Sequence, residues 1–276
     1  MALRAPLTHV FRAALIALTL GAGSPSNPVL AGEAYTLGVF PHLPPRELEK
    51  VYAPMAADLA EALGRPVHFR SSSTYQKFMK KLDQQAFEIV FVQPFDYVRI
   101  ADRFGYRPLA TRGEPLRAIF TVEPDGPIED IEDLRGKTVA LPPKVAAVSY
   151  LVKGHLAKLG IDDVHYKYQR SHVSCMQQVL IGSAAACGTA APALRFFEHR
   201  MDTQLDVVAK TQPIPHTLFA VSPRVPAAEQ KLVRDRIVSW ADSEAGRKLL
   251  SRGKLTPFKR IDDSDYDIVR EMLQHQ

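Results

Sequence analysis

The sequence lacks the motifs of the common enzyme classes. It contains no Gly-x-Ser-x-Gly turn, no His-Glu-x-x-His motif, no phosphate-binding loop and no dinucleotide fingerprint after a strand. The nine histidines show no His-x-His or His-x-x-x-His spacing, the usual arrangement of metal ligands. We therefore expect a protein that is not an enzyme and that holds no metal and no cofactor.

Long runs of charged or apolar residues are scarce too. The chain has 35 Lys and Arg against 30 Asp and Glu, a net charge of +5, and no basic run of the kind that binds nucleic acid. Its N-terminal apolar run, Ala13 to Ala22, is too short to cross a bilayer, which takes roughly 20 apolar residues. We expect neither a nucleic-acid partner nor a membrane span.

The apolar run instead belongs to an export signal. Arg4 and Arg12 are the only charges in residues 1–31, and small residues lead to a cleavage point after Ala31. The alternative is a buried N-terminal helix, which the Gly-Ser-Pro-Ser-Asn-Pro stretch disfavours. Because no cysteine stands near the cleavage point, we expect a soluble periplasmic protein that is not a lipoprotein. The remaining residues, 32–276, suffice for one large domain or two lobes.

Strand and helix patterns alternate twice along this mature chain. The first alternation combines apolar strands with helical periodicity and predicts a parallel, doubly wound sheet. Its strands are expected at 35–40, 66–70 and 87–94, and its helices at 48–63, 75–82 and 95–104. The second alternation has strands at 138–141, 164–169 and 185–189, and helices at 148–159 and 173–181. Polar-faced helices at 227–241, 243–251 and 264–273 end the chain.

Two extended segments separate these alternations. They contain "LRAIFTVEPDG" and "LDVVAKTQPIPHTLFAV", and we interpret them as hinge strands that cross between two α/β lobes. The first lobe is then residues 32–118 with 215–276, and the second lobe is residues 119–214. Ligands of open α/β sheets bind outside the carboxyl ends of the strands, so each lobe aims these ends into a shared cleft. Closure about the hinges buries the ligand.

Several motifs resemble those of a known family. "YTLGVFPHLPPRELEKVYAPMAADLAEALG", "SSSTYQKFMKKLDQQAFEIVFVQPFDYV" and "IEDIEDLRGKTVAL" are similar to the phosphate, phosphite and phosphonate-binding proteins of ABC importers, over nearly the whole mature chain. The resemblance implies the type II periplasmic binding protein fold. It also implies a small-molecule ligand, handed to an ABC permease in the inner membrane. Some relatives instead present a ligand to a sensor kinase.

The resemblance also implies where the ligand is held. Tyr75 matches the tyrosine of the family's Ser-x-x-Tyr motif, Tyr97 the tyrosine after the third strand, and His172 the family's cleft histidine. Gln93 precedes Tyr97 at the end of a buried strand and offers a polar group. Ser171 is a good helix N-cap beside His172. The alternative for each tyrosine is a place in the core.

One junction departs from the family pattern. Members that bind phosphonate carry Ser-Thr-Ser-Gly at the start of the helix after residue 141, where this chain has Ala146, Ala147, Val148 and Ser149. A helix N-terminus still presents free amides and a partial positive charge, and Lys144 lies close by. We expect Lys144 and Ser149 at the ligand, which is either a small anion or a less charged organic molecule. The alternative for Lys144 is a solvated side chain.

The only two cysteines, Cys175 and Cys187, are expected on adjacent elements. A helix of roughly 10 Å leads away from Cys175, and a strand of roughly 10 to 13 Å returns to Cys187, so the two arrive at the same level. A disulfide fits the oxidising compartment and would pin the helix that carries His172. Free buried thiols and a soft-ligand contact are the alternatives.

The function that combines these observations is a monomeric solute receptor of an ABC importer, which binds without catalysis. A sensory partner of a membrane histidine kinase, with an oxyanion or arsenite-like ligand, is the alternative. An enzyme on the same fold is a third class and predicts turnover, against which the missing motifs argue.

Overall fold

A computed structural model describes residues 1–2 and 32–274 of the chain. The expected signal peptide therefore lies outside the described residues, apart from Met1 and Ala2. Within the described part of the chain, no helix has the length and apolar character needed to cross a membrane.

The first sheet combines strands from both ends of the mature chain. Its order is β11-β4-β10-β3-β1-β2. The strands β1, β2 and β3 run parallel, whereas β10, β4 and β11 pair antiparallel. The bounds are β1 Tyr35–Val39, β2 Val67–Arg70, β3 Ile89–Val92, β4 Arg107–Arg112, β10 Leu218–Val221 and β11 Phe258–Arg260.

The second sheet uses only the middle of the chain and has the order β7-β6-β8-β5-β9. The strands β6, β7 and β8 are parallel, and β5 pairs antiparallel with both β8 and β9. The bounds are β5 Ile119–Val122, β6 Thr138–Leu141, β7 His165–Tyr168, β8 Ala186–Thr189 and β9 Asp206–Lys210.

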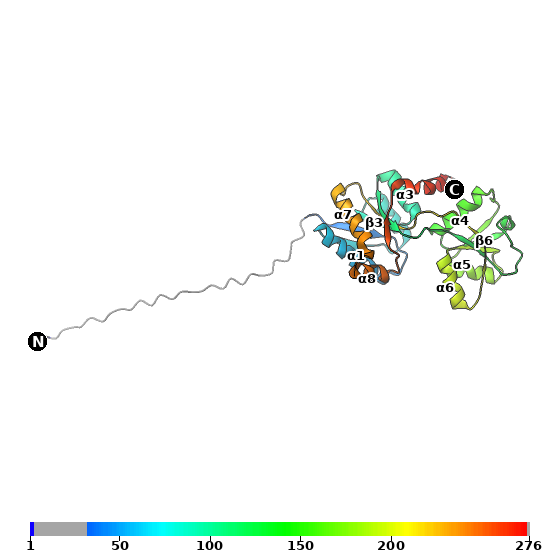
Figure 1. Ribbon diagram of the computed structural model, residues 1–276, viewed down its shortest axis with the longest axis horizontal. Helices are drawn as coiled ribbons and strands as arrows, with labels where there is room; N and C mark the ends of the chain where they lie inside the picture. Colours follow the sequence, from blue (N-terminus) through cyan, green and yellow to red (C-terminus); the bar gives the residue numbers. More distant parts are fainter. Residues whose placement is uncertain (3–31, 275–276) are drawn as a thin grey trace. The chain divides into compact units, whose positions relative to one another are not determined.

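Helices connect the strands of each sheet (Figure 1). Those of the first sheet are α1 Pro45–Leu63, α2 Tyr75–Asp83, α3 Pro94–Phe104, α7 Ala227–Val238, α8 Glu244–Arg252 and α9 Asp267–Gln274. Those of the second are α4 Ala147–Lys158, α5 His172–Leu180 and α6 Ala191–Met201. Short 3₁₀ turns lie at Glu132–Leu134, Ser239–Ala241 and Asp263–Tyr266.

Local chemistry sets the ends of the helices that approach the strand ends. Proline at the first position, which lacks the amide that a helix start leaves unbonded, opens both α1 and α3. Gly64 and Gly105 end these two helices with φ of 63° and 71°, a region that glycine adopts without steric cost. Thr74 caps α2 by accepting a hydrogen bond from the amide of Lys77.

The chain passes between the two sheets twice, at residues 113–118 and 211–217. These crossings are joined where Leu116 and Ile214 exchange two backbone hydrogen bonds of 2.9 Å. Two α/β halves with two hinge crossings are thus confirmed. The alternating strands are parallel as predicted, whereas β5 and β10, which follow the crossings, pair antiparallel with β8 and β3.

Candidate functional site

The candidate site lies where the parallel strands of both sheets end. The connections after β2 and β3 lead into α2 and α3, and those after β6, β7 and β8 lead into α4, α5 and α6. Ligands of open α/β sheets bind at such carboxyl ends. Two contacts join the halves directly at this level, one made by Gln93 and one made by Phe95.

Gln93 connects the start of α3 to the start of α4. Its Nε2 donates to the carbonyl of Val145 at 3.0 Å, and its Oε1 accepts from the amide of Ala147 at 2.9 Å. Both polar atoms of the carboxamide are therefore used within the protein. The amide of Ala147 lies at the start of α4, where an anion was expected to bind. It is bonded to the neutral oxygen of Gln93 instead.

The other predicted residues of the α4 junction, Ser149 and Lys144, have different surroundings. Ser149 is fully buried, and its hydroxyl hydrogen-bonds the carbonyls of Pro142 and Pro143, at 3.3 and 3.1 Å. Lys144 is exposed. Ala146 caps α4 without any side-chain hydrogen bond, since alanine offers no acceptor. The amide of Ala147 and the hydroxyl of Ser149 are therefore both bonded within the protein.

Tyr75 and Asp96 form a polar pair between α2 and α3. The hydroxyl of Tyr75 donates to Oδ1 of Asp96. Asp96 is only 7% exposed, and among the described residues its buried Oδ2 has no hydrogen-bond partner. Burial raises the pKa of Asp96 to about 6, although the Tyr75 bond and the charge of Arg99 oppose the rise.

Aromatic rings lie beside this pair. Phe95 on α3 stacks on Tyr150 of α4, with the ring centroids 4.7 Å apart and the planes 22° from parallel. Burial raises the pKa of Tyr150, and the negative charge of Asp96 adds to the rise. Asp96 and Tyr150 were not predicted as site residues. The available signal was their position at the end of a buried strand and at the start of a helix.

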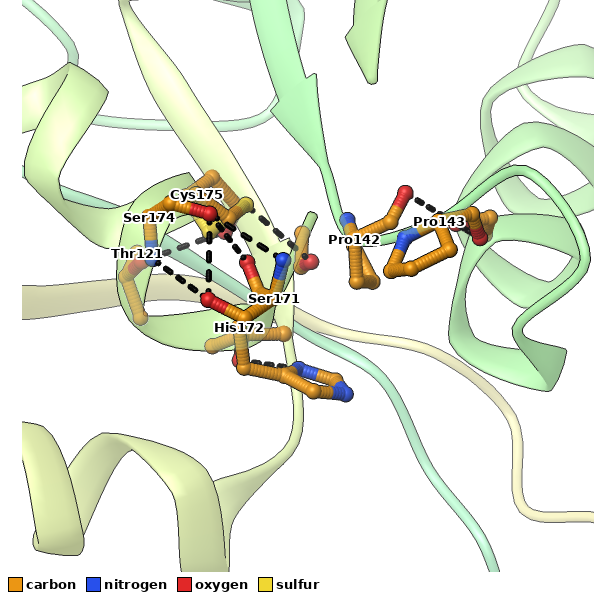
Figure 2. Close-up of a disulfide and its surroundings, with 11 residues drawn as sticks. Thr121, Pro142, Pro143, Ser171, His172, Ser174 and Cys175 are labelled. Carbon is orange, nitrogen blue, oxygen red and sulfur yellow. Dashed lines mark hydrogen bonds between the residues drawn. A yellow bond between two sulfur atoms is a disulfide. The ribbon is translucent and has the colours of Figure 1, made fainter. Parts of the chain in front are cut away.

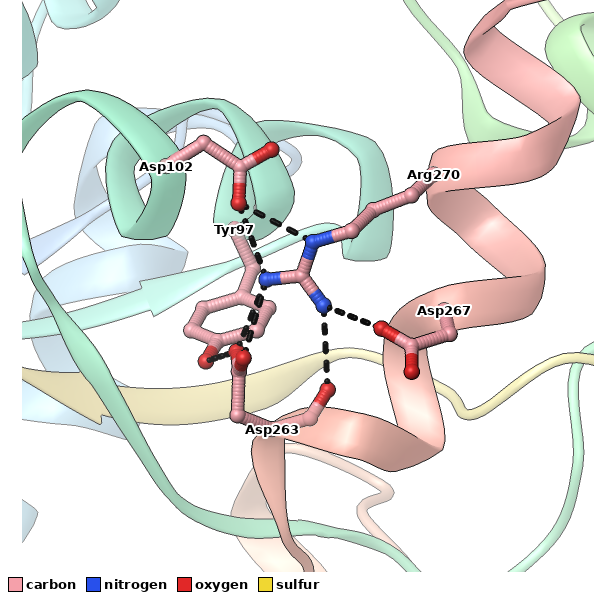
Figure 3. A network of polar contacts seen from close by, with 5 residues as sticks. All are labelled: Tyr97, Asp102, Asp263, Asp267 and Arg270. Carbon is pink, nitrogen blue, oxygen red and sulfur yellow. Dashed lines mark hydrogen bonds and ion pairs between the residues drawn. The ribbon is translucent and has the colours of Figure 1, made fainter.

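Tyr97 packs on the side of α3 that contacts the C-terminal segment. It is fully buried, its hydroxyl donates to Asp263, and its ring lies 4.6 Å from that of Tyr266. Figure 3 shows Arg270 of α9 completing this network with Asp102, Asp263 and Asp267. Because a helix turns by about 100° per residue, the residue after Asp96 points away from Tyr75. The structure places Tyr97 in a polar network between α3 and α9.

This placement gives a direct prediction. Tyr97→Phe loses one hydrogen bond to a charged group, so the free energy of unfolding should fall by about 2 kcal/mol in urea titrations. The affinity for the solute should stay unchanged in calorimetric titrations. Tyr75→Phe is the matched variant, because it also removes a tyrosine hydroxyl, but one that lies at the candidate site. This variant should bind the solute more weakly. A weaker solute affinity in Tyr97→Phe would contradict the placement.

The start of α5 carries the remaining predicted residues (Figure 2). Ser171 caps the helix, and its side chain and that of Ser174 each accept the other's backbone amide at 3.1 Å. His172 places Nδ1 at 2.8 Å from the hydroxyl of Thr189, at the end of β8. Burial lowers the pKa of His172, which favours the neutral imidazole over the cation that an anion would call for.

One turn of α5 after His172, the structure joins Cys175 and Cys187 in a disulfide, with the Cα atoms 5.7 Å apart. Both cysteines are fully buried and pack with Met176 and Val179. The bond ties α5 to β8, the strand that presents Thr189 to His172. Within residues 32–274, no group of three or more His, Cys, Asp or Glu side chains is arranged to hold a metal ion.

Of the predicted residues, the structure brings Tyr75 and Gln93 together with Asp96 and Tyr150, through direct contacts or electrostatic interaction. His172 lies at a neighbouring strand end of the second sheet, whereas Ser149, Ser171 and Tyr97 serve internal bonds and Lys144 faces solvent. The arrangement can hold a small molecule by a carboxylate, aromatic rings and an imidazole.

Comparisons with known proteins agree with this architecture. A sequence profile described as "ABC transporter, phosphonate, periplasmic substrate-binding protein" matches residues 37–266. XAC2383 from Xanthomonas citri, solved bound to ATP, shares 17% identity and a TM-score of 0.74, over 88% of this chain and 97% of that one. PhnD1 from Prochlorococcus marinus, in complex with methylphosphonate, shares 12% identity and a TM-score of 0.70, over 87% and 97%.

A third similar structure is PA3383 from Pseudomonas aeruginosa, a binding protein component of an ABC phosphonate transporter. It shares 16% identity and a TM-score of 0.66, over 87% of this chain and 85% of that one. At these identities the solved structures show the fold alone, which is the two-lobed fold of periplasmic binding proteins. The expected fold class is therefore confirmed.

Proposed function

The chain belongs to the family of periplasmic substrate-binding proteins of phosphonate ABC transporters, and from this premise we propose that it receives one small solute between its two sheets. The observation that carries this proposal is the pair of hydrogen bonds between Gln93 of the first half and Val145 and Ala147 of the second. The strand ends of both halves approach each other here, so a solute at this level touches both.

The proposal extends to the partner and to the limits of the lobes. The chain works as a monomer, hands the solute to an ABC permease and neither binds nucleic acid nor transforms the solute. Its lobes comprise residues 32–118 with 215–276, and 119–214, which move about the crossings at Leu116 and Ile214. The mature form begins after cleavage near Ala31 and carries no lipid. No observation in the structure favours the sensor-kinase partner over the permease.

The test is a binding screen of residues 32–276 by thermal unfolding, followed by calorimetric titration of each positive compound. The panel includes phosphate, phosphite, methylphosphonate, sulfate, arsenite, amines and carboxylates. A solute at 100 times its dissociation constant stabilises the fold by about 2.7 kcal/mol, which is readily detected. We expect one solute per chain, recovered chemically unchanged after long incubation. Conversion of the solute into a product would contradict a receptor without catalysis.

A further inference from the structure

A buried carboxylate oxygen without a partner marks the centre of the site. Asp96 is 7% exposed, its Oδ1 accepts the hydroxyl of Tyr75, and hydrogen bonding from Gln93 also lowers its pKa. Its Oδ2 is buried and has no hydrogen-bond partner among the described residues. Burying a charge without a partner is costly, so such a group is expected where a ligand supplies the missing partner.

The surroundings of Asp96 suit a positive charge. Tyr75 and Phe95 adjoin it from α2 and α3, and Tyr150 interacts with it from α4 while stacking on Phe95. Aromatic faces attract cations through their negative π-electron density, most strongly where water is excluded. Arg99 is the cation nearest to this site on α3, and its guanidinium is already paired with Asp83 at 2.5 Å.

The same site is poorly suited to a fully charged anion. The α4 amide of Ala147 is bonded to Gln93, and the only hydroxyl of the junction, on Ser149, is bonded to proline carbonyls. A phosphonate placed here would face the buried Asp96 carboxylate, and like charges at short range repel. The chemistry of the junction therefore differs from that of an oxyanion site.

We infer that the solute carries an organic ammonium group, which binds against the Asp96 carboxylate between the rings of Tyr75, Phe95 and Tyr150. This inference rests on the receptor function proposed above and names the chemical class of its solute. Gln93 contacts Ala147, and Phe95 contacts Tyr150, so both contacts join the two halves close to Asp96 in the sequence. The ammonium group enters when the two halves part and these contacts open.

The test compares probes that differ only in charge. Choline and its neutral isostere 3,3-dimethyl-1-butanol have the same shape, and ethanolamine carries a bare ammonium group. Inorganic phosphate and methylphosphonate represent the anions. Calorimetric titration of residues 32–276 should show one site for choline or ethanolamine. The neutral isostere should bind roughly tenfold more weakly or worse, because it lacks the attraction to Asp96 and to the rings.

Asp96→Asn tests the residue itself. It should weaken ammonium binding by roughly 30-fold or more, the usual loss when one partner of a buried charge pair is removed. Asp162→Asn is the matched control, because Asp162 is an exposed aspartate in the connection before β7, and binding should not change. The comparison of choline with its neutral isostere uses the unmodified chain, so it decides the question even where Asp96→Asn fails to fold.

The outcomes separate the two proposals. If phosphate or methylphosphonate binds the wild type and Asp96→Asn equally and neither ammonium probe binds, the ammonium inference is wrong and the receptor function stands. Equal affinity for choline and its neutral isostere also overturns the inference. If none of these probes binds and the wider screen yields no solute, the receptor function itself is contradicted.

Discussion

Replacing both Cys175 and Cys187 by alanine is expected to lower the free energy of unfolding by about 3 kcal/mol. The disulfide closes a loop across a separation of 12 residues. A cross-link of this span lowers the conformational entropy of the unfolded chain, which raises the free energy of unfolding by about 3 kcal/mol. Both side chains are fully buried, so alanine also removes packing contacts with Met176 and Val179. Urea titration of oxidised wild type and of the double variant measures the difference.

Reduction of the wild type separates the covalent bond from the packing. Thiols keep nearly the same volume, so reduced wild type isolates the loss of the cross-link. We expect weaker solute binding in the reduced protein as well, because α5 carries His172 and the disulfide holds it to the strand of Thr189. Identical unfolding curves for oxidised and reduced protein would contradict a stabilising role of this bond.

Asp96→Asn is expected to make the solute-free protein more stable at neutral pH, in contrast to its effect on binding. The pKa of Asp96 is raised by burial to about 6, above the ordinary value of about 4. Because the pKa in the folded protein is higher than in the unfolded chain, protonation of Asp96 favours the folded state. This contribution to the free energy of unfolding is fully present below about pH 4 and is lost as the pH rises to about 6. Asparagine does not titrate and avoids this loss.

The size of the effect follows from the shift. About two pKa units correspond to about 3 kcal/mol, so the stability of Asp96→Asn relative to wild type should rise by about that much between pH 4 and pH 7. Tyr75, Tyr150 and Arg99 are the titratable or charged groups that act on Asp96 from α2, α4 and α3. Unfolding titrations at both pH values measure the change, with Asp162→Asn as the control. A difference independent of pH would show that Asp96 titrates normally.

The alternating elements are predictable because their patterns are local. Leu48, Met55 and Leu59 lie at helical spacing and are buried along α1, and all four residues of β3 are buried, as its continuous apolar sequence indicates. The helix α6 is harder to predict from the sequence. Its apolar residues Phe196 and Met201 are exposed, so they disturb the helical spacing of the buried residues Leu194 and Phe197. The three-residue strand β11 depends on pairing with β4, far away in the sequence.

The site is predictable only at the level of strand ends. The position of Gln93 after a buried strand indicates a place where the strands end. Only the fold shows that its carboxamide is hydrogen-bonded to Val145 and Ala147. The resemblance singled out Tyr97, whereas the turn of α3 directs its neighbour Asp96 toward Tyr75. The partners of a polar side chain depend on elements distant in sequence, and local patterns do not contain them.

Amide hydrogen exchange of residues 32–276, measured with and without a solute found by the screen, reports directly on binding between the two halves. A solute held between the two sheets should slow exchange at the first turns of α3 and α4 together, because it touches both and holds the halves closed. The first turn of α8, which follows a 3₁₀ turn and not the end of a strand, serves as the internal reference. Protection confined to the helices of one sheet, or found only away from the strand ends, would contradict binding between the two halves.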